Sequence, residues 1–581
     1  MEQNNLDIMR HSCSHLLASA VLCLYPGTKL AIGPSIEEGF YYDFDFANPI
    51  NETDLEKISL EMQSLIKENL GFEKKEINLE EARKLFSDQQ YKLELIDDLE
   101  KEGNQTVSIY TTGDPSTSSG QLFTDLCAGP HIENTSEIGA FKLLSLAGAY
   151  WKGTEKNKML TRIYGTCFPT QKELDDYLNL LEEVKKRDHK KLGPQLGLFM
   201  FDETAPGMPY WLPKGTIVYN ELLKFWRDEH KKRGYLETIT PLLNKKQLYE
   251  LSGHWEHYKK NMFICETEEK ETYCLKPMNC PNAMTIYKSQ TRSYRDLPLR
   301  FSDCDTLHRN EKSGQLDGLL RVQKFAQDDA HIFVTEDQIK QEYERIFEIA
   351  KLFYSIFDIK FRIRLGTNPD DFMGDKEVWK KAENILKEIL EKSDFEYYIG
   401  EGEGAFYGPK LDIMMQDFGG REWQTGTIQL DFQLPKRFDL KYIDSDGKEK
   451  MPVVIHRVIY GSLERFIGIL IEHYAGAFPV WLAPVQAIIL PITDKQIDYA
   501  YKVAESLRNQ DIRTEVEIEN KPISGKIRDA EMQKIPYMII VGAREAKANT
   551  ISVRQRGEKD LGVMDLKDFL AKIKEEIENK L

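Results

Sequence analysis

The sequence predicts a multidomain protein that combines α/β and α+β parts. Its 581 residues are enough for about three or four domains, each with its own core. Residues 299–331 alternate apolar and polar side chains on both sides of a glycine-containing turn, which is typical of paired strands. Residues 483–581 alternate strand-like with helix-like stretches, which indicates a small α/β domain with a mixed sheet.

Charge and cysteine usage exclude several classes of protein. The net charge of −17 argues against general electrostatic binding of DNA, so any nucleic-acid contact needs a local basic surface. The eight cysteines include no CxxC pair, as suits a reducing cytoplasm. No apolar run is long enough to span a bilayer. We therefore expect a cytoplasmic protein with no membrane partner.

The N-terminal part has the pattern of an α+β domain. A helical pattern over residues 9–25 precedes a strand-like segment at 39–46 and a second helical stretch at 52–69. A charged helical stretch over 172–191 then indicates a connector. Glycines and prolines follow it and mark a boundary, after which a large α/β region extends to residue 482.

The second strand of the 299–331 segment has an unusual polar face. Because every second side chain of a strand shares a face, one face here holds Arg321, Gln323, Phe325, Gln327, Asp329 and His331. Alternation alone more often indicates a solvated outer face. Phe325 lies in the middle of this face, however, and Arg309 and Glu311 precede it. An aromatic ring, arginines and a carboxylate are suited to binding a purine and its phosphates.

Motifs along the whole chain resemble those of one enzyme family. HRNE at 308–311 and GSLERFIGILIEH at 461–473 look like the second and third class II synthetase motifs, and the segment that ends at Pro241 looks like the first. Five further stretches are more specific: KPMNCPNAM, AQDDAHIF, AFYGPKLDI, REWQTGTIQLDF and VVIHRVIYGS. Together they resemble bacterial threonyl-tRNA synthetases. The resemblance implies an ATP-dependent ligase that activates L-threonine as the adenylate, transfers it to tRNA(Thr), and edits seryl-tRNA.

The same resemblance implies four domains and a homodimer. These are an editing domain at 1–168, a helical linker at 169–195, a class II catalytic domain with an antiparallel sheet at 196–482, and an anticodon-binding domain at 483–581. The first motif forms the dimer interface in this family. A small ubiquitin-like domain usually precedes the editing domain, and we expect this chain to lack it because HSCSH follows Met1 so closely.

For ATP, the resemblance implies a set of charged and aromatic contacts. Arg309 would hold the α-phosphate and Glu311 the adenine amino group. Phe325 would stack on the base with Arg465 on its other side, and Arg321 would reach the γ-phosphate. Magnesium would bridge the phosphates. Such a site acts by neutralising charge and aligning the reactants.

Cys280, His331 and His456 match the zinc ligands of the family. Their spacing alone would not reveal a metal site, because they lie far apart in the sequence. One zinc per chain with three protein ligands keeps an open position for substrate. Coordination of the threonine amine and hydroxyl would exclude the isosteric valine, which a hydrophobic pocket discriminates by only about a hundredfold.

Four further residues match positions near the amino acid or the adenylate. Gln327, Asp329 and Tyr407 would support the polar groups of threonine. Lys410 in YGPK would contact the forming adenylate, although alone it could equally be a surface lysine.

Serine differs from threonine by one methyl group, which changes the binding free energy by about 1–3 kcal/mol. A synthetic site alone therefore does not reject serine well enough, and a second, hydrolytic site is needed.

The editing site is expected in the N-terminal domain. His11 and His15 are spaced i and i+4 and so share a helix face. With Cys127 and His131 in CAGPH they form a polar set of four. The same pattern binds zinc in related alanine-editing domains, so a metal is an open alternative; we favour a metal-free site that positions water. Further editing-site positions are matched by Tyr42, Lys92 and Asp125.

In the C-terminal domain, Arg554 and Arg556 match anticodon-reading positions, although Lys547 stands where an acidic partner is expected.

Three other functions agree less well with these residues. A synthetase for serine or proline would lack the zinc set, and an inactive RNA-binding paralogue would have no need of all the motif arginines. A metallohydrolase built on His11, His15, Cys127 and His131 would leave most of the chain without a role.

Overall fold

The computed structural model describes residues 5–113, 123–370, 372–557 and 559–581. The chain divides into two units, Met1–Glu182 and Glu183–Leu581. The predicted fold class is confirmed, because both units combine helices with largely antiparallel sheets and the last part of the chain has a mixed sheet. The four domain boundaries stay a prediction.

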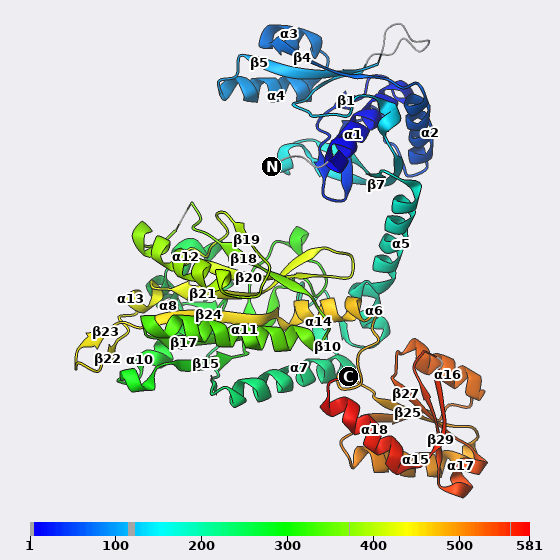
Figure 1. The fold of residues 1–581 in the computed structure, drawn as a ribbon, viewed down its shortest axis with the longest axis vertical. Helices are drawn as coiled ribbons and strands as arrows, with labels where there is room; N and C mark the ends of the chain where they lie inside the picture. The colour runs from blue at the N-terminus through cyan, green and yellow to red at the C-terminus, as the bar shows by residue number, and fades with distance from the viewer. Residues whose placement is uncertain (1–4, 114–122, 371, 558) are drawn as a thin grey trace. The chain divides into compact units, whose positions relative to one another are not determined.

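The first unit is built around a buried helix, α1, that packs on β3 and β8 (Figure 1). The buried surface of α1 combines apolar side chains with polar ones that find partners, such as Ser12 and Ser14, whose hydroxyls donate to backbone carbonyls. In the described residues, one sheet has the order β1-β3-β8-β7 with β2 beside β3, and a second has the order β4-β5-β6. The elements are α1 (Asn5–Leu24), β1 (Lys29–Leu30), β2 (Ser35–Ile36), β3 (Gly39–Asp45), α2 (Asp54–Lys67), β4 (Phe72–Asn78), α3 (Leu79–Leu85), α4 (Gln90–Lys101), β5 (Thr106–Thr112), β6 (Phe123–Leu126), β7 (Ala140–Tyr150), β8 (Met159–Phe168) and the greater part of α5 (Gln171–Arg187).

The second unit contains a large sheet with the order β11-β15-β17-β24-β21-β20-β18-β19, and β16 pairs with β17. All pairings from β15 to β18 along this path are antiparallel. Helices α11 and α14 pack against the central strands (Figure 1). Its main elements are α6 (His189–Gln195), α7 (Pro213–Lys232), β11 (Leu236–Glu237), β12 (Leu243–Lys245), α8 (Lys246–Ser252), β13 (Ile264–Glu266), β14 (Thr272–Leu275), α10 (Cys280–Lys288), β15 (Leu299–Asp303), β16 (Thr306–His308), β17 (Lys324–Val334), α11 (Ile339–Ser355), β18 (Phe361–Gly366), α12 (Lys376–Glu391), β19 (Tyr397–Gly400), β20 (Lys410–Gln416), β21 (Glu422–Asp431), β24 (Val453–Ser462) and α14 (Leu463–His473).

The last part of the second unit has a mixed sheet with the order β26-β25-β27-β28-β29. Strand β25 pairs in parallel with β26 and β27, whereas β28 pairs antiparallel with β27 and β29. This is the predicted small α/β arrangement. Its elements are β25 (Ala487–Pro491), α15 (Ile497–Arg508), β26 (Thr514–Val516), α16 (Ile523–Met532), β27 (Tyr537–Val541), α17 (Ala543–Ala548), β28 (Ile551–Gln555), β29 (Lys559–Met564) and α18 (Leu566–Glu578).

Two local predictions were wrong. The second strand of the 299–331 segment, expected from residue 319, begins only at Lys324, because residues 317–321 form a turn in which the carbonyl of Asp317 accepts from the amides of Leu320 and Arg321. The connector expected as one helix is two, α5 and α6. Asp188 interrupts them with a non-helical ψ of 115°, and its side chain caps α6 by accepting from the amide of Lys190.

Within the residues that the structure describes, we find no helix long and apolar enough to cross a membrane.

Candidate functional site

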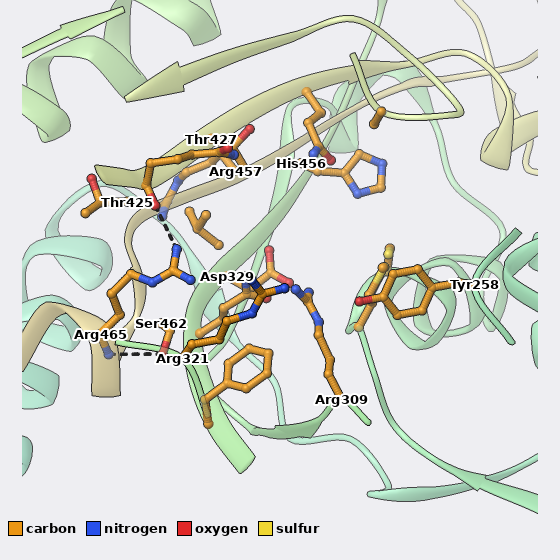
Figure 2. Close-up of a pocket in the computed structure, with 18 of the residues that line it drawn as sticks. Tyr258, Arg309, Arg321, Asp329, Thr425, Thr427, His456, Arg457, Ser462 and Arg465 are labelled. Atoms are coloured by element: carbon orange, nitrogen blue, oxygen red, sulfur yellow. Dashed lines mark hydrogen bonds between the residues drawn. The ribbon is translucent and has the colours of Figure 1, made fainter. Parts of the chain in front are cut away.

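A cavity of about 530 Å³ lies in the second unit, against β17, β21 and β24 (Figure 2). It collects eleven of the predicted residues: Cys280, Arg309, Glu311, Arg321, Phe325, Gln327, Asp329, His331, Tyr407, His456 and Arg465. The polar face of β17 is thus a cavity wall and not a solvated surface. Leu320 and Val322 alternate with these residues in the sequence and would face the other way on a strand, but they precede β17 and also line the cavity.

At one end of the cavity, three arginines from different elements approach one another (Figure 2). The guanidinium carbon of Arg309 lies 5.0 Å from the centre of the Phe325 ring, and Arg321 Nη2 lies 2.8 Å from Glu311 Oε2. Arg465 donates to the carbonyls of Leu320 and Gln424, at 2.8 and 3.0 Å. Burial, together with the charges of Arg309 and Arg321, lowers the pKa of Arg465. Like charges held this close favour a polyanionic ligand.

At the other end, Cys280, His331 and His456 bring one donor atom each to within 4.8 Å of one another. The two histidines are directly opposite on paired strands, and Cys280 begins α10. His456 Nε2 lies 2.9 Å from Asp431 Oδ2, as in a carboxylate–histidine–metal arrangement. His331 Nδ1 is buried and has no hydrogen-bond partner among the described residues. All three side chains are buried.

The chemistry of this triad fits zinc. Burial lowers the pKa of His331, and the neighbouring His456 lowers it further, so the imidazole is neutral and can act as a ligand. Burial beside Asp329 raises the pKa of the Cys280 thiol. A thiolate at this position therefore needs a bound cation to stabilise it. Nitrogen and sulfur donors in this number are those that zinc prefers.

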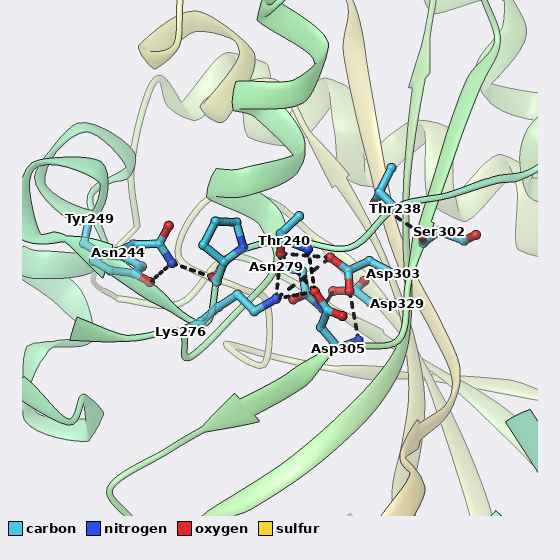
Figure 3. Close-up of polar contacts among 11 residues, drawn as sticks. Thr238, Thr240, Asn244, Tyr249, Lys276, Asn279, Ser302, Asp303, Asp305 and Asp329 are labelled. Atoms are coloured by element: carbon cyan, nitrogen blue, oxygen red, sulfur yellow. Dashed lines mark hydrogen bonds and ion pairs between the residues drawn. The ribbon is translucent and has the colours of Figure 1, made fainter. Parts of the chain in front are cut away.

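A buried polar network lies behind the cavity wall (Figure 3). Lys276 is fully buried, and its ammonium group is 2.6 Å from Thr240 Oγ1 and 2.9 Å from Asp305 Oδ2. Asp303 lies opposite Asp329 on the paired strands β15 and β17. Burial, with the charge of Asp303, raises the pKa of Asp329 to about 8. The network joins the cavity wall to the segment that contains Thr240.

Lys410 is the one predicted residue of the catalytic part that does not line the cavity. It lies in β20, is 9% exposed, and its ammonium group is 2.8 Å from Asp412 Oδ2. It is therefore not a surface lysine. Its backbone pairs with Gln429, which does line the cavity.

In the first unit, all seven predicted editing residues come together. His11, His15, Cys127 and His131 bring their donor atoms to within 4.8 Å of one another. The thiol of Cys127 is 3.4 Å from Nε2 of both His11 and His131. Asp125 accepts from Tyr42 at 2.6 Å, pairs with Lys92 at 2.5 Å and lies 3.7 Å from His15 Nε2.

The editing cluster is held in an uncharged state by burial. Burial lowers the pKa of His11, His15 and His131. It also raises the pKa of Cys127 to about 11. Neutral imidazoles can accept a proton from water or bind a metal, so the set suits either hydrolysis by a positioned water or metal binding.

The two arginines predicted to contact an anticodon lie in and just after β28. Arg556 donates to three carbonyls, those of Lys534, Ala477 and Phe478, at 2.6, 2.9 and 3.0 Å. Arg554 Nε is buried and has no partner among the described residues. Arg556 therefore has a structural role in this conformation. More of the guanidinium N–H groups of Arg554 remain able to donate to a ligand.

Some residues of the site were not predicted from the sequence. Lys276 belongs to the quoted stretch KPMNCPNAM but received no role, although a buried lysine needs partners. The cavity is also lined by Tyr258, Met278, Gln424, Thr425, Thr427, Gln429, Arg457 and Ser462. Thr425, Thr427 and Gln429 alternate along β21, and this period of two was the available signal.

Comparison with known families assigns three parts of the chain. Residues 263–474 match the tRNA synthetase class II core domain (G, H, P, S and T). Residues 486–576 match the anticodon binding domain. Residues 107–164 match the threonyl and alanyl tRNA synthetase second additional domain.

Whole-chain relatives agree with these matches. The chain is 51% identical over 581 residues to the threonine–tRNA ligase of Acetivibrio thermocellus, covering 100% of this chain and 90% of that protein. It is 52% identical to the corresponding ligase of Clostridium botulinum strain Kyoto, covering 98% and 89%. A crystal structure of the RNA binding domain of threonyl-tRNA synthetase from Cryptosporidium parvum superposes with a TM-score of 0.65 at 42% identity, covering 67% of this chain and 98% of that one.

Proposed function

The chain belongs to the threonine–tRNA ligase family, and we infer that it activates threonine with ATP, transfers it to tRNA(Thr) and hydrolyses mischarged seryl-tRNA. The observation that carries the inference for this chain is the single cavity in which three arginines and Phe325 lie at one end and the Cys280, His331 and His456 triad at the other. Threonine-dependent exchange of pyrophosphate into ATP tests it.

We propose that the arginine end of the cavity binds ATP, with magnesium on its phosphates. The threonine carboxylate attacks the α-phosphorus, the bond to the β-phosphate oxygen breaks, and pyrophosphate leaves with that electron pair. Arg309 neutralises the charge that develops at the α-phosphate, and Arg321 and Arg465 hold the rest of the nucleotide. Arg321 donates to one oxygen of Glu311, Oε2, so the other oxygen, Oε1, can accept from the adenine amino group while the pair stays intact.

We propose that threonine binds at the triad end. Zinc held by Cys280, His331 and His456 would coordinate the threonine amine and hydroxyl and so reject valine. Gln327, Asp329 and Tyr407 line the same part of the cavity and can bond the polar groups of the substrate. Lys410 does not line the cavity and is paired with Asp412, so we assign it an indirect electrostatic role at the adenylate.

We propose that the chain forms a homodimer through the segment after α7. Strand β11 is an edge of the large sheet, and Ile239 beside it is 85% exposed. Leu236, Leu242 and Leu243 are also exposed there. The Lys276 network fixes this segment at Thr240, so the apolar side chains are presented on a rigid support (Figure 3). Apolar side chains on a sheet edge favour burial against a second copy.

Ile239→Glu is expected to convert a dimer into a monomer, because a charge would be buried at the centre of the interface. Light scattering coupled to gel filtration measures the mass directly. The matched control is Ile399→Glu, since Ile399 is also exposed but lies on β19 at the opposite edge. A parent protein with the mass of one chain at micromolar concentration would contradict the proposal.

We propose that the cluster of His11, His15, Cys127 and His131 is a metal-free editing site. Its neutral imidazoles can position and activate water against the ester of seryl-tRNA. The Asp125 network with Tyr42 and Lys92 fixes one side of the cluster.

We further propose that the C-terminal part binds the anticodon of tRNA, with Arg554 as a direct contact and Arg556 holding the segment in place.

Replacing both His11 and His15 by alanine is expected to leave threonine charging unchanged and to let seryl-tRNA accumulate. The synthetic site discriminates against serine by only about ten- to two-hundredfold, so misacylation should be visible at high serine. Seryl-tRNA deacylation, threonine charging and Tm are measured on one preparation. His257→Ala, a histidine of the other unit, is the control and should keep deacylation. Deacylation that survives in a folded double variant would overturn the editing assignment.

A further inference from the structure

A buried histidine outside the proposed contacts, His189, connects three elements of the second unit. It begins α6 and is 1% exposed. Its Nδ1 lies 2.7 Å from Glu472 Oε1 on α14. Its Nε2 accepts a hydrogen bond of 3.0 Å from the backbone amide of Leu319. Helix α6, helix α14 and the turn before β17 thus meet at one ring.

These contacts determine the protonation of the ring. A carboxylate only accepts, so Nδ1 must donate to Glu472; a backbone amide only donates, so Nε2 must be unprotonated. His189 is therefore the neutral Nδ1–H tautomer. Asp188, His189 and Glu472 also lie close enough to hold a metal ion, but both ring nitrogens are already engaged. The group is a hydrogen-bonded support and not a metal site.

The turn that His189 holds leads directly to a cavity arginine. Leu319 is followed by Leu320, whose carbonyl accepts from Arg465 Nε at 2.8 Å, and by Arg321. Gly318 has a positive φ of 50°, and a Cβ there would lie 2.2 Å from His189 Nε2. The close approach of turn and ring thus requires glycine at 318. Displacing the ring or the turn would move both the Arg465 contact and Arg321.

We propose that His189 is a positioning residue for ATP binding: by fixing the Leu319 amide it sets the turn that places Arg321 at the triphosphate. The proposal rests on the ATP-dependent activation inferred above. It predicts a selective effect, because the threonine end of the cavity is built on β17, β24 and α10, which His189 does not touch. Loss of the Leu319 bond should therefore weaken ATP binding and spare threonine binding.

Two substitutions separate the ring's contacts. In His189→Asn the side chain can still donate to Glu472 but is too short to reach Leu319, whereas in His189→Gln the amide oxygen can occupy the position of Nε2. In pyrophosphate exchange, His189→Asn should raise KM for ATP about tenfold, the factor for one buried hydrogen bond, and leave KM for threonine within about twofold. His189→Gln should restore KM for ATP to within about threefold of the parent. Gly318→Ala should resemble His189→Asn.

The exposed neighbour Lys191 on the same helix provides the control, and Lys191→Ala should behave as the parent. A folded His189→Asn variant with the parent KM for ATP would overturn the proposal. So would a parallel rise of both KM values with a lowered Tm, which is what a purely structural role predicts.

Amide hydrogen exchange of residues 316–322 gives a readout that does not need activity. We expect the Leu319 amide to exchange faster in His189→Asn. The same amide should stay protected in the parent and in His189→Gln. Equal protection in all three would show that His189 does not hold the turn. If the parent lacks threonine-dependent pyrophosphate exchange, the proposed function fails, and the amide exchange still decides whether His189 supports the turn.

Discussion

Arg309→Ala is expected to lower threonine-dependent pyrophosphate exchange by at least about a thousandfold, equivalent to roughly 4 kcal/mol of transition-state stabilisation. Arg309 comes directly after β16, where its guanidinium faces both the Phe325 ring and the cavity. A pre-placed cation at the phosphorus under attack is worth most in a site shielded from water. Initial rates at saturating ATP and threonine provide the measurement.

The same experiment needs a control for loss of a cation near the site. Lys312 is an exposed cation three residues further along, and Lys312→Ala should change the rate by less than about threefold. The Tm of Arg309→Ala should stay close to that of the parent, because the side chain makes one 3.3 Å hydrogen bond, to the carbonyl of Pro277. Activity within about tenfold of the parent would show that Arg309 is not the phosphate anchor.

Cys280→Ser is expected to remove both the bound metal and threonine activation. A serine hydroxyl is a poor zinc ligand because it remains protonated, and His331 and His456 alone do not hold the ion. Elemental analysis of the parent should give one zinc per chain. Cys265→Ser, at an exposed cysteine, should keep both zinc and activity.

Metal analysis also separates the two clusters. One zinc per chain in the parent, unchanged in the His11→Ala, His15→Ala double variant, agrees with a metal-free editing site. Two zinc ions, of which that variant loses one, would show that the editing cluster binds metal instead. Freshly prepared, active parent protein without zinc would contradict the assignment of Cys280, His331 and His456.

The period-two pattern of residues 325–331 was enough to predict which side chains share a face, because alternation is a property of the strand itself. It could not say whether that face meets solvent or a cavity. The cavity wall that contains Phe325 and Asp329 is extended by β24 and β21 of the same sheet, which lie more than ninety residues further along the chain. The zinc triad was likewise invisible to spacing, and only the family resemblance identified it.

The start of the second strand was predicted wrongly because an alternating pattern does not reveal the hydrogen bonds that determine local conformation. The strand was predicted to start too early because the bond from Leu319 to His189 and the Asp317 turn hold residues that alternate in sequence. The anticodon role of Arg556 stays a prediction, and its guanidinium donates to three carbonyls of distant segments. The adenylate contact of Lys410 also stays a prediction, and its ammonium group pairs with Asp412 on the same strand face.

We propose that the cavity of the second unit activates threonine. Pyrophosphate exchange into ATP, measured with each of the twenty amino acids in turn, tests it most directly. Threonine should give the highest rate, serine a rate about ten- to two-hundredfold lower, and valine only background, since it lacks the hydroxyl group. The proposal would be contradicted if another amino acid stimulated pyrophosphate exchange more than threonine does. It would also be contradicted if threonine did not stimulate exchange at all.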